Sequence, residues 1–415
     1  MQQKIIDNIG DPEILEQLYR ENSREFAKCF SEVADQFDSE LVRIWRIRLS
    51  YGKTEQSGFK WSELWIVIVI ALITGALLKI PALFGGIKEE VFYPRDLALI
   101  AFNGIIIYTF YFNKITDKRK WLFYGLTVLI LSLFANLLPV LEKSDSINLA
   151  LGHIALLLWC VFGLSFISFD YKKTEKRMAY IRFNGEYIIM NGLLYSAGML
   201  LVFLSFGLFQ AIKIDLMKVF YNDYIMVFGA SAIPIVSLYL IRRYPDITKK
   251  ISPVIARVFT PLVLISLMVY LILLIFSVNK IGDDREALLV FNIMLLAIMA
   301  IIVFSVSELD KDKTKDFNIL VLFMLAALAI VADAIALFAI SSRLQVGITP
   351  NRVVVFVSNI LIFINLVFIA KSLFRSYFLE KPVEEVDKSV AGYIPVYIVY
   401  TLFVIFALPF IFGFY

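Results

Sequence analysis

The sequence predicts an all-α membrane protein, a bundle of about eleven transmembrane helices with a small helical tail at its N-terminus. Two observations predict this class. The 415 residues are 60% hydrophobic with a mean hydropathy of +0.78, whereas soluble domains are about 45–50% apolar. The charged residues, 18% of the chain, cluster between long apolar runs. That pattern is typical of a polytopic membrane protein and not of a large soluble core.

Residues 1–62 are polar and predict short helices outside the membrane. Asp11, followed directly by a proline, is a strong helix start, because aspartate caps helices well and proline suits their first position. Asn22, or the serine after it, can cap a second helix, and Asp38 or Ser39 can cap a third. No signal peptide is expected, because the first apolar run begins only behind this polar tail.

The third predicted helix of the tail carries apolar and basic residues together. Its apolar residues are Leu41, Ile44, Trp45 and Ile47, and its basic residues are Arg43, Arg46 and Arg48. Such a helix could lie on anionic lipid, or it could pack with the other two helices into a small domain beside the membrane. We favour the packed domain, which could in turn bind a cytosolic protein partner.

Eleven apolar runs follow, each close to the roughly 20 residues that a helix needs to cross a bilayer. They fall at residues 64–84, 96–112, 121–141, 148–168, 187–209, 222–241, 256–278, 286–306, 318–341, 353–373 and 392–412. Together they predict a transmembrane helical domain over residues 63–415, surrounded by the lipid bilayer.

The basic residues of the connecting loops predict how these spans are oriented. If the N-terminus is cytoplasmic, the five inner loops carry 21 Lys and Arg residues and the outer loops carry 9. Cytoplasmic loops of membrane proteins carry this kind of excess. The counts predict a multi-pass protein of the cell inner membrane, with a cytoplasmic N-terminus and a periplasmic C-terminus.

Two further stretches stand out from the regular pattern. Residues 210–220 place four apolar side chains on one face, which suits an interfacial helix on the outer side. In the sixth run, Gly229, Ser231 and Pro234 lie close together and permit a kink, because neighbouring helices can satisfy the freed backbone groups. Such kinks occur at transporter sites, although a purely structural kink is the commoner outcome.

The sequence offers few residues for chemistry. It contains no phosphate-binding glycine loop and no His/Cys spacing for a metal, so we expect no metal site, no cofactor and no nucleic-acid partner. His153, the only histidine, cannot hold a metal alone, because such a site needs three or four ligands. It is a candidate for a solute or ion path, although a packed, hydrogen-bonded side chain is the commoner role.

Asp333 is the strongest candidate for a functional residue. It lies near the middle of the ninth run, where an ionised carboxylate costs at least about 2.5 kcal/mol. Its helix face is built of small residues, Ala326, Ala329 and Ala336, which let helices approach closely. The acid should therefore face protein or a cavity. It could be a proton or cation site, one half of an ion pair, or a neutral hydrogen-bonded group.

Lys79 is the predicted partner of this acid. It lies in the outer half of the first run, at a depth that differs from that of Asp333 by only about 3 Å at 1.5 Å per residue. The alternative is that Lys79 extends outward to the membrane surface. Other polar groups within the runs are expected to join neighbouring helices. They are the amides Asn103, Asn191, Asn292, Asn359 and Asn365.

The turn between the ninth and tenth runs carries the motif Arg-x-x-x-Gly-Ile-Thr-x-x-Arg. Gly347 permits a backbone turn with positive φ, and Thr349 can cap the next helix across Pro350 at its first position. Arg343 and Arg352 flank the turn on the outer side. They could grip a phosphate or a carboxylate, or they could simply mark the membrane interface.

This motif resembles the bacterial membrane proteins of domain-of-unknown-function family four-one-five-three. The tail is similar to versions of that family from Bacteroidetes-type bacteria, in the segments DPEILEQLYRENSREF and SELVRIWRIRLSYG. The resemblance implies a bacterial inner-membrane protein of many helices. The family label carries no activity, so the resemblance implies no mechanism.

Three hypotheses for function follow from these features. The first is a transporter or permease for a small solute, which could be an anion and could be coupled to protons through Asp333. The second is a membrane sensor or assembly subunit whose tail binds a cytosolic partner. An intramembrane transferase is disfavoured, because catalytic acids and metal ligands are scarce. A water-filled cavity that reaches Asp333 would favour the first hypothesis, and a dry bundle with an apolar groove on the tail would favour the second.

Overall fold

The computed structural model describes residues 1–52, 61–84, 86–141, 143–211, 224–276, 285–311, 313 and 315–415. The chain divides into two compact units, Met1–Glu63 and Leu64–Tyr415. The predicted interfacial helix at 210–220 lies outside the described residues except for its first two.

The first unit is a small helical domain. Its elements are α1 (Gln2–Asp7), α2 (Pro12–Glu21), α3 (Ser23–Val33), the 3-10 turn η1 (Ala34–Gln36) and α4 (Glu40–Gly52). The predicted caps are confirmed, because Asp11, Asn22 and Ser39 accept hydrogen bonds from backbone N–H groups in the first turn of the following helix. Only α1 was not predicted.

Aromatic residues fill the core of this unit. Phe26, Phe30 and Trp45 are buried, and their rings pack against one another. Ile44 and Ile47 are 53% and 46% exposed, so two of the four apolar residues named in α4 lie outside this core. Each residue turns a helix by about 100°, and with Trp45 facing the core its near neighbours in sequence point away.

Two of the three arginines of α4 are engaged inside the unit. Arg46 pairs with Asp35 at 2.8 Å and Arg48 pairs with Glu16 at 2.6 Å. The hydrogen bond from Arg48 holds the pKa of Glu16 below its usual value. A contact between the tail and anionic lipid stays a prediction.

The second unit is a multi-pass membrane bundle. Ten described helices are long and apolar enough to cross a bilayer, and the shorter apolar helix Glu63–Leu78 adds to them. The elements are α5 (Trp61–Leu78), α6 (Ile80–Leu83), α7 (Glu89–Phe112), α8 (Lys118–Leu137), α9 (Asp145–Phe166), α10 (Thr174–Ala211), α12 (Met226–Arg243), α13 (Pro245–Phe276), α14 (Arg285–Ser307), α15 (Phe317–Val346), α16 (Pro350–Phe378), α17 (Glu384–Ala391), α18 (Ile394–Phe406) and α19 (Leu408–Ile411). No strand occurs among the described residues. The predicted all-α membrane bundle is confirmed.

Prolines shorten the first and last predicted spans. The helix of the first span ends at Leu78, because Pro81 lacks an N–H group and its ring clashes with the carbonyl four residues earlier. The helix of the last span ends at Phe406, ahead of Pro409. Both runs continue into a single separate turn of helix, α6 or α19.

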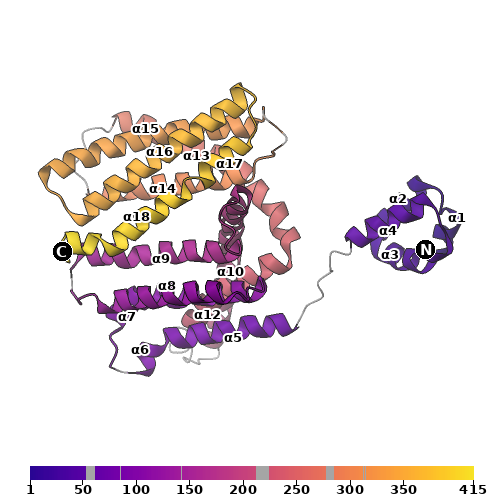
Figure 1. Ribbon diagram of the computed structural model, residues 1–415, viewed down its shortest axis with the longest axis horizontal. Helices are drawn as coiled ribbons and strands as arrows, with labels where there is room; N and C mark the ends of the chain where they lie inside the picture. The colour runs from indigo at the N-terminus through magenta and orange to yellow at the C-terminus, as the bar shows by residue number, and fades with distance from the viewer. Residues whose placement is uncertain are drawn as a thin grey trace. The chain divides into compact units, whose positions relative to one another are not determined.

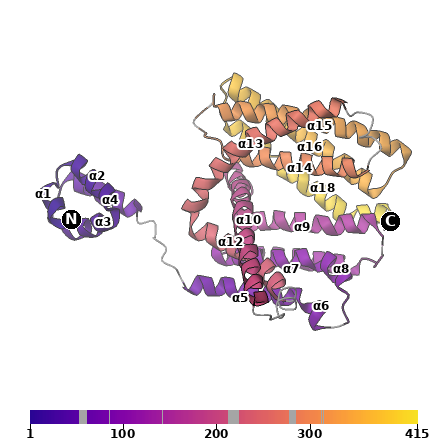
Figure 2. The ribbon, with the colours of Figure 1, turned by 180° about the vertical axis from the view of Figure 1, so that it is seen from behind.

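The helices of the membrane unit form two groups (Figure 1). In the first, α15 packs against α13, α14 and α16, and in the second, α7 packs against α8, α9 and α12. The groups meet where α18 packs along α9. The long helix α10 runs across the direction of α9 and contacts α12 in one group and α14 and α17 in the other (Figures 1 and 2). It begins well before the predicted span at 187–209.

Polar contacts tie together the loops at one end of the bundle, which we call the basic end. Its loops are residues 113–117, 167–173, 308–316 and 379–383. Asn113 donates to the carbonyl groups of Ser165 and Phe166, and Lys311 pairs with Asp387 at 3.1 Å. At the opposite end, Ser144 donates to the Phe414 carbonyl at 2.6 Å, and Asn351 hydrogen-bonds to Asp145. Loops predicted to share a side of the membrane therefore lie together.

Reporter fusions at Lys118, Lys173, Lys249, Lys313 and Lys381 are all expected to report the cytoplasm. The reason is the excess of Lys and Arg in these five loops. Alkaline phosphatase and green fluorescent protein fusions measure the two sides in opposite ways. A periplasmic signal from any one of the five, with cytoplasmic signals from the others, would overturn the eleven-span map.

Candidate intramembrane site around Asp333

Asp333 is fully buried within α15, at 0% exposure. Three buried alanines of the same helix surround it in sequence, Ala329, Ala332 and Ala336. Their short side chains allow neighbouring helices to approach closely, and α16 packs along α15 over much of its length. The acid faces the interior of the bundle and not the lipid, as its small-residue face predicted.

Neither carboxylate oxygen of Asp333 has a hydrogen-bond partner among the described residues. About nine buried polar groups in ten are paired in native proteins, and an unpaired one costs about 1–3 kcal/mol. The interpretation of Asp333 as a hydrogen-bonded group between helices is therefore wrong for the described part of the chain. Because the buried Asp333 carboxyl group lowers the stability of the fold, we look for a functional reason for it.

Tyr397 of α18 is a polar side chain near Asp333, and Asn365 of α16 is hydrogen-bonded to Tyr397. Asn365 of α16 donates its amide N–H to the Tyr397 hydroxyl of α18 at 3.0 Å, and the Asp333 carboxyl group interacts electrostatically with Tyr397. Asn365 is 1% exposed, and its carbonyl oxygen also lacks a partner among the described residues. Three helices thus contribute an acid, an amide and a hydroxyl to a group that we call the buried acid cluster: Asp333, Asn365 and Tyr397.

Lys79 is not the partner of Asp333, so the predicted ion pair is wrong. The Lys79 ammonium lies 5.3 Å from the centroid of the Tyr224 ring. The helices α5 and α15 lie on opposite sides of the membrane unit (Figure 1). Lys79 and Asp333 were predicted to lie at similar depths in the membrane. Similar depth does not show that two helices are neighbours in the bundle.

The turn after α15 is closed by Arg352. Its guanidinium donates to the carbonyl groups of Arg343, at 3.0 Å, and Gly347, at 2.6 Å. Carbonyl groups at the end of a helix lack intrahelical donors, and Arg352 satisfies two of them. The predicted cap is confirmed, because the Thr349 hydroxyl accepts from the Arg352 N–H and Pro350 is the first residue of α16.

Two predictions for this turn are corrected. Gly347 has φ of 167°, which is extended backbone and not the positive-φ turn that was expected. Arg343 follows Asp333 by ten residues on the same helix, which separates the two along the axis by about 15 Å. Neither arginine of the motif therefore neutralises the buried acid.

His153 lies on α9 and contacts α18. Its Nδ1 is 2.7 Å from the Leu149 carbonyl of its own helix, and its ring meets Tyr400 edge to face. These contacts fit the structural role. Among the residues that the structure describes, no group of three or more His, Cys, Asp or Glu side chains could hold a metal ion.

The amides within the spans mostly join helices, as predicted. Asn103 hydrogen-bonds to Tyr124 of α8, and Asn359 donates to Asn292 of α14 at 2.8 Å. The Asn191 amide differs, because it donates to the Tyr187 carbonyl of its own helix at 2.8 Å.

The kink expected in the sixth run has structural support from α10. Pro234 frees the carbonyl of Ala230, because proline cannot donate to it. The Tyr195 hydroxyl donates to that carbonyl at 3.1 Å, and the Tyr187 hydroxyl donates to the Pro234 carbonyl at 3.0 Å. The freed group is thus satisfied by protein, and the structural role of this proline is sufficient.

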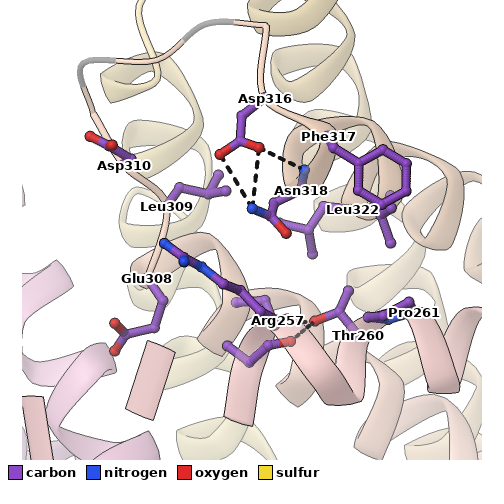
Figure 3. Close-up of a pocket in the computed structure, with 13 residues that line it drawn as sticks. Arg257, Thr260, Pro261, Glu308, Leu309, Asp310, Asp316, Phe317, Asn318 and Leu322 are labelled. Atoms are coloured by element: carbon purple, nitrogen blue, oxygen red, sulfur yellow. Dashed lines mark hydrogen bonds between the residues drawn. The ribbon is translucent and has the colours of Figure 1, made fainter. Parts of the chain in front are cut away.

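A cleft at the basic end was not predicted from the sequence (Figure 3). It lies between α13, α14 and α15, and Arg257, Thr260, Ser305 and Asn318 are among its lining residues. The signal that could have found it is the pair of prolines, Pro253 and Pro261, inside α13. Prolines within a spanning helix often mark irregular backbone beside a cavity.

No protein-family model matches the chain, and the comparisons with curated proteins and with solved structures each found no match. The function is therefore argued from the site alone.

Proposed function

We propose that this protein is a small-solute permease of a bacterial inner membrane, coupled to protons through Asp333. The observation that supports the proposal is the fully buried Asp333 carboxyl group, which has no partner among the described residues. Ionisable residues inside a membrane bundle commonly serve proton relays or ion paths in pumps and transporters.

The chemistry of the buried acid cluster suits reversible proton binding. An ionised carboxylate without a counter-charge is costly in an apolar interior, and a bound proton removes that cost. The Tyr397 hydroxyl interacts electrostatically with the Asp333 carboxyl group, and Asn365 hydrogen-bonds to that hydroxyl. The proton stays while the site is sealed, and it leaves when a rearrangement of the helices lets water reach the acid.

The arrangement of helices offers a route for that rearrangement. The two groups of helices meet along α9 and α18, and α10 crosses between them (Figure 1). Tyr397 lies on α18, at the boundary, whereas Asp333 lies on α15, inside one group. A relative movement of the groups would therefore separate Tyr397 from Asp333 and open the acid to water.

The proposal is tested with Asp333→Asn in proteoliposomes. Solid-supported-membrane currents are recorded for acetate, succinate, inorganic phosphate and alanine at several pH values. The wild type is expected to give a pH-dependent current with one of them, and the variant is expected to lose that dependence while keeping its thermal unfolding transition. Glu384→Gln, an exposed acid of the same unit, is the control. Infrared difference spectra check proton binding directly, because a protonated-carboxyl band should disappear in Asp333→Asn.

An unchanged pH dependence and an unchanged carboxyl band in Asp333→Asn would contradict the proposal. A second function, a sensor or assembly subunit, is then favoured by the exposed apolar pair Ile44 and Ile47 on α4. In that case Ile44→Glu with Ile47→Glu should abolish the biological activity and leave both units folded, as measured by circular dichroism.

A further inference from the structure

The cleft at the basic end carries a charge that no other described side chain neutralises. Figure 3 shows the Arg257 side chain extending across it, away from Pro261, with its guanidinium end between Leu309 and Glu308. Arg257 is exposed, and no ion pair or hydrogen bond joins its guanidinium to a described residue. Beneath it, Thr260 and Ser305 are buried, and their hydroxyl oxygens are 2.7 Å apart.

The three acids that line the same cleft are already engaged. Glu308 lies 3.6 Å from the Arg182 guanidinium, and Asp310 lies 3.3 Å from the Lys313 ammonium. Asp316 caps α15 by accepting from a backbone N–H of its first turn. Each acid thus has a donor or a cation of its own, whereas the Arg257 guanidinium keeps its donors for a further group.

Backbone groups add to this chemistry. Pro261 follows Arg257 by four residues, so the Arg257 carbonyl has no α-helical donor. The N-terminus of α15 also meets the cleft and carries the partial positive charge of its helix dipole. In transporters with broken or irregular helices, positive helix ends face the anionic groups of the solute, whereas free carbonyl groups bind cations or hydrogen-bond donors.

The cleft and Asp333 lie on one face of α15. Leu322 lines the cleft, and Ala326, Ala329 and Asp333 follow it at helical spacings of four, three and four residues. All four are buried. Eleven residues separate Leu322 from the acid, which is about 17 Å along the helix axis. Small side chains therefore line the face of α15 between the cleft and the acid.

We propose that this cleft binds a small anion, a carboxylate or a phosphate, through Arg257. The guanidinium fork matches both groups, since each offers two oxygens to parallel N–H donors. A free solute and a lipid headgroup present the same chemistry. The role of the cleft as a port for the transported solute rests on the function proposed above, whereas anion binding at Arg257 does not.

The experiment measures protection of a cysteine at the cleft in the full chain. Phe317, which lines the cleft and is 71% exposed, is changed to cysteine in a background with Cys29→Ser and Cys160→Ala. The rate of maleimide labelling is measured in nanodiscs of zwitterionic lipid, with and without inorganic phosphate or acetate. At least one anion is expected to slow labelling several-fold in a saturable way. Anionic-lipid nanodiscs without added anion test the headgroup source, which would show as the same protection.

Charge variants decide whether Arg257 is responsible. Arg257→Gln is expected to abolish the protection, and Arg257→Lys is expected to retain part of it, because the charge stays but the fork is lost. Arg119→Gln, which removes another exposed arginine of the basic end, should leave the protection unchanged. An absence of protection with both anions and with anionic lipid, or equal protection in Arg257→Gln, would overturn the proposal.

The same measurement separates this inference from the proposed function. Asp333→Asn should keep full protection at the cleft, because the acid lies about 17 Å away along α15. If Asp333→Asn transports with unchanged pH dependence while Arg257→Gln loses protection, the proton site fails and the anion site stands. If protection never depends on Arg257 while Asp333→Asn loses its pH dependence, the anion site fails and the proton site stands.

Discussion

Asp333→Leu is expected to stabilise the membrane bundle by about 1–3 kcal/mol and to abolish proton-dependent transport. Leucine has the same number of side-chain heavy atoms as aspartate and the same branch point. It therefore fills the same space next to the short side chains Ala329, Ala332 and Ala336. It also removes two oxygens that are buried without a partner among the described residues. A residue whose removal stabilises the fold is one that the protein keeps for its activity.

Thermal unfolding of the purified protein in detergent measures this effect. Asp333→Asn should gain less stability than Asp333→Leu, since its amide is still a buried polar group. The control is Asp387→Leu, because Asp387 is also buried but pairs with Lys311 at 3.1 Å. Its loss should destabilise the bundle. A lower transition temperature for Asp333→Leu would show that the carboxylate has a stabilising partner beyond the described residues.

Features of the fold that depend on local chemistry were predictable. Caps at Asp11, Asn22 and Thr349 follow from the residue types alone, because the capping oxygen and the N–H groups it binds are close neighbours in sequence. The spans follow from the length of each apolar run. The corrected span ends lie near Pro81 and Pro409, and both prolines were visible in the sequence.

The composition of the site depended on the order of helices around the bundle. Asp333 was predictable as a buried acid from its depth and its alanine face. The other members of the buried acid cluster, Asn365 and Tyr397, come from α16 and α18. The hydrophobic pattern of one apolar run does not identify the helices that pack against it. The same limit explains why Lys79, well matched in depth, lies on a distant helix.

The cleft could not be predicted from the positions of its residues, because its chemistry depends on which of its charged side chains pair with one another. Arg257 was one of 21 basic residues in the inner loops and had no distinguishing neighbour in sequence. That no other described side chain neutralises its guanidinium becomes evident only when the acids nearby are seen to bind other groups, such as Glu308 with Arg182 and Asp310 with Lys313. Charge counts predict orientation, but they do not show which charges are already neutralised.

The crossing of α10 over α14 depends on the absence of a side chain at Gly185. A Cβ atom placed there would lie 2.0 Å from two ring atoms of Phe304, closer than any real contact. Just beyond this crossing, the Arg182 guanidinium donates to the Ser307 carbonyl of α14. Small residues are required where two membrane helices approach this closely, so the steep path of α10 between the two groups of helices relies on this glycine.

Gly185→Ala is therefore expected to destabilise the membrane unit by about 1–3 kcal/mol, the usual cost of overpacking a core. Gly192→Ala is the matched control on the same helix, because a Cβ atom there meets nothing within 4 Å. It should instead stabilise the helix by up to about 1 kcal/mol, since alanine restricts the unfolded backbone and favours helix. Thermal unfolding of both variants in detergent measures whether Gly185→Ala lowers and Gly192→Ala raises the transition temperature. Phe304→Ala should reduce the cost of Gly185→Ala, because it removes the ring that the new methyl group strikes. Equal effects at both glycines, or no coupling to Phe304, would mean that α10 and α14 do not cross at Gly185.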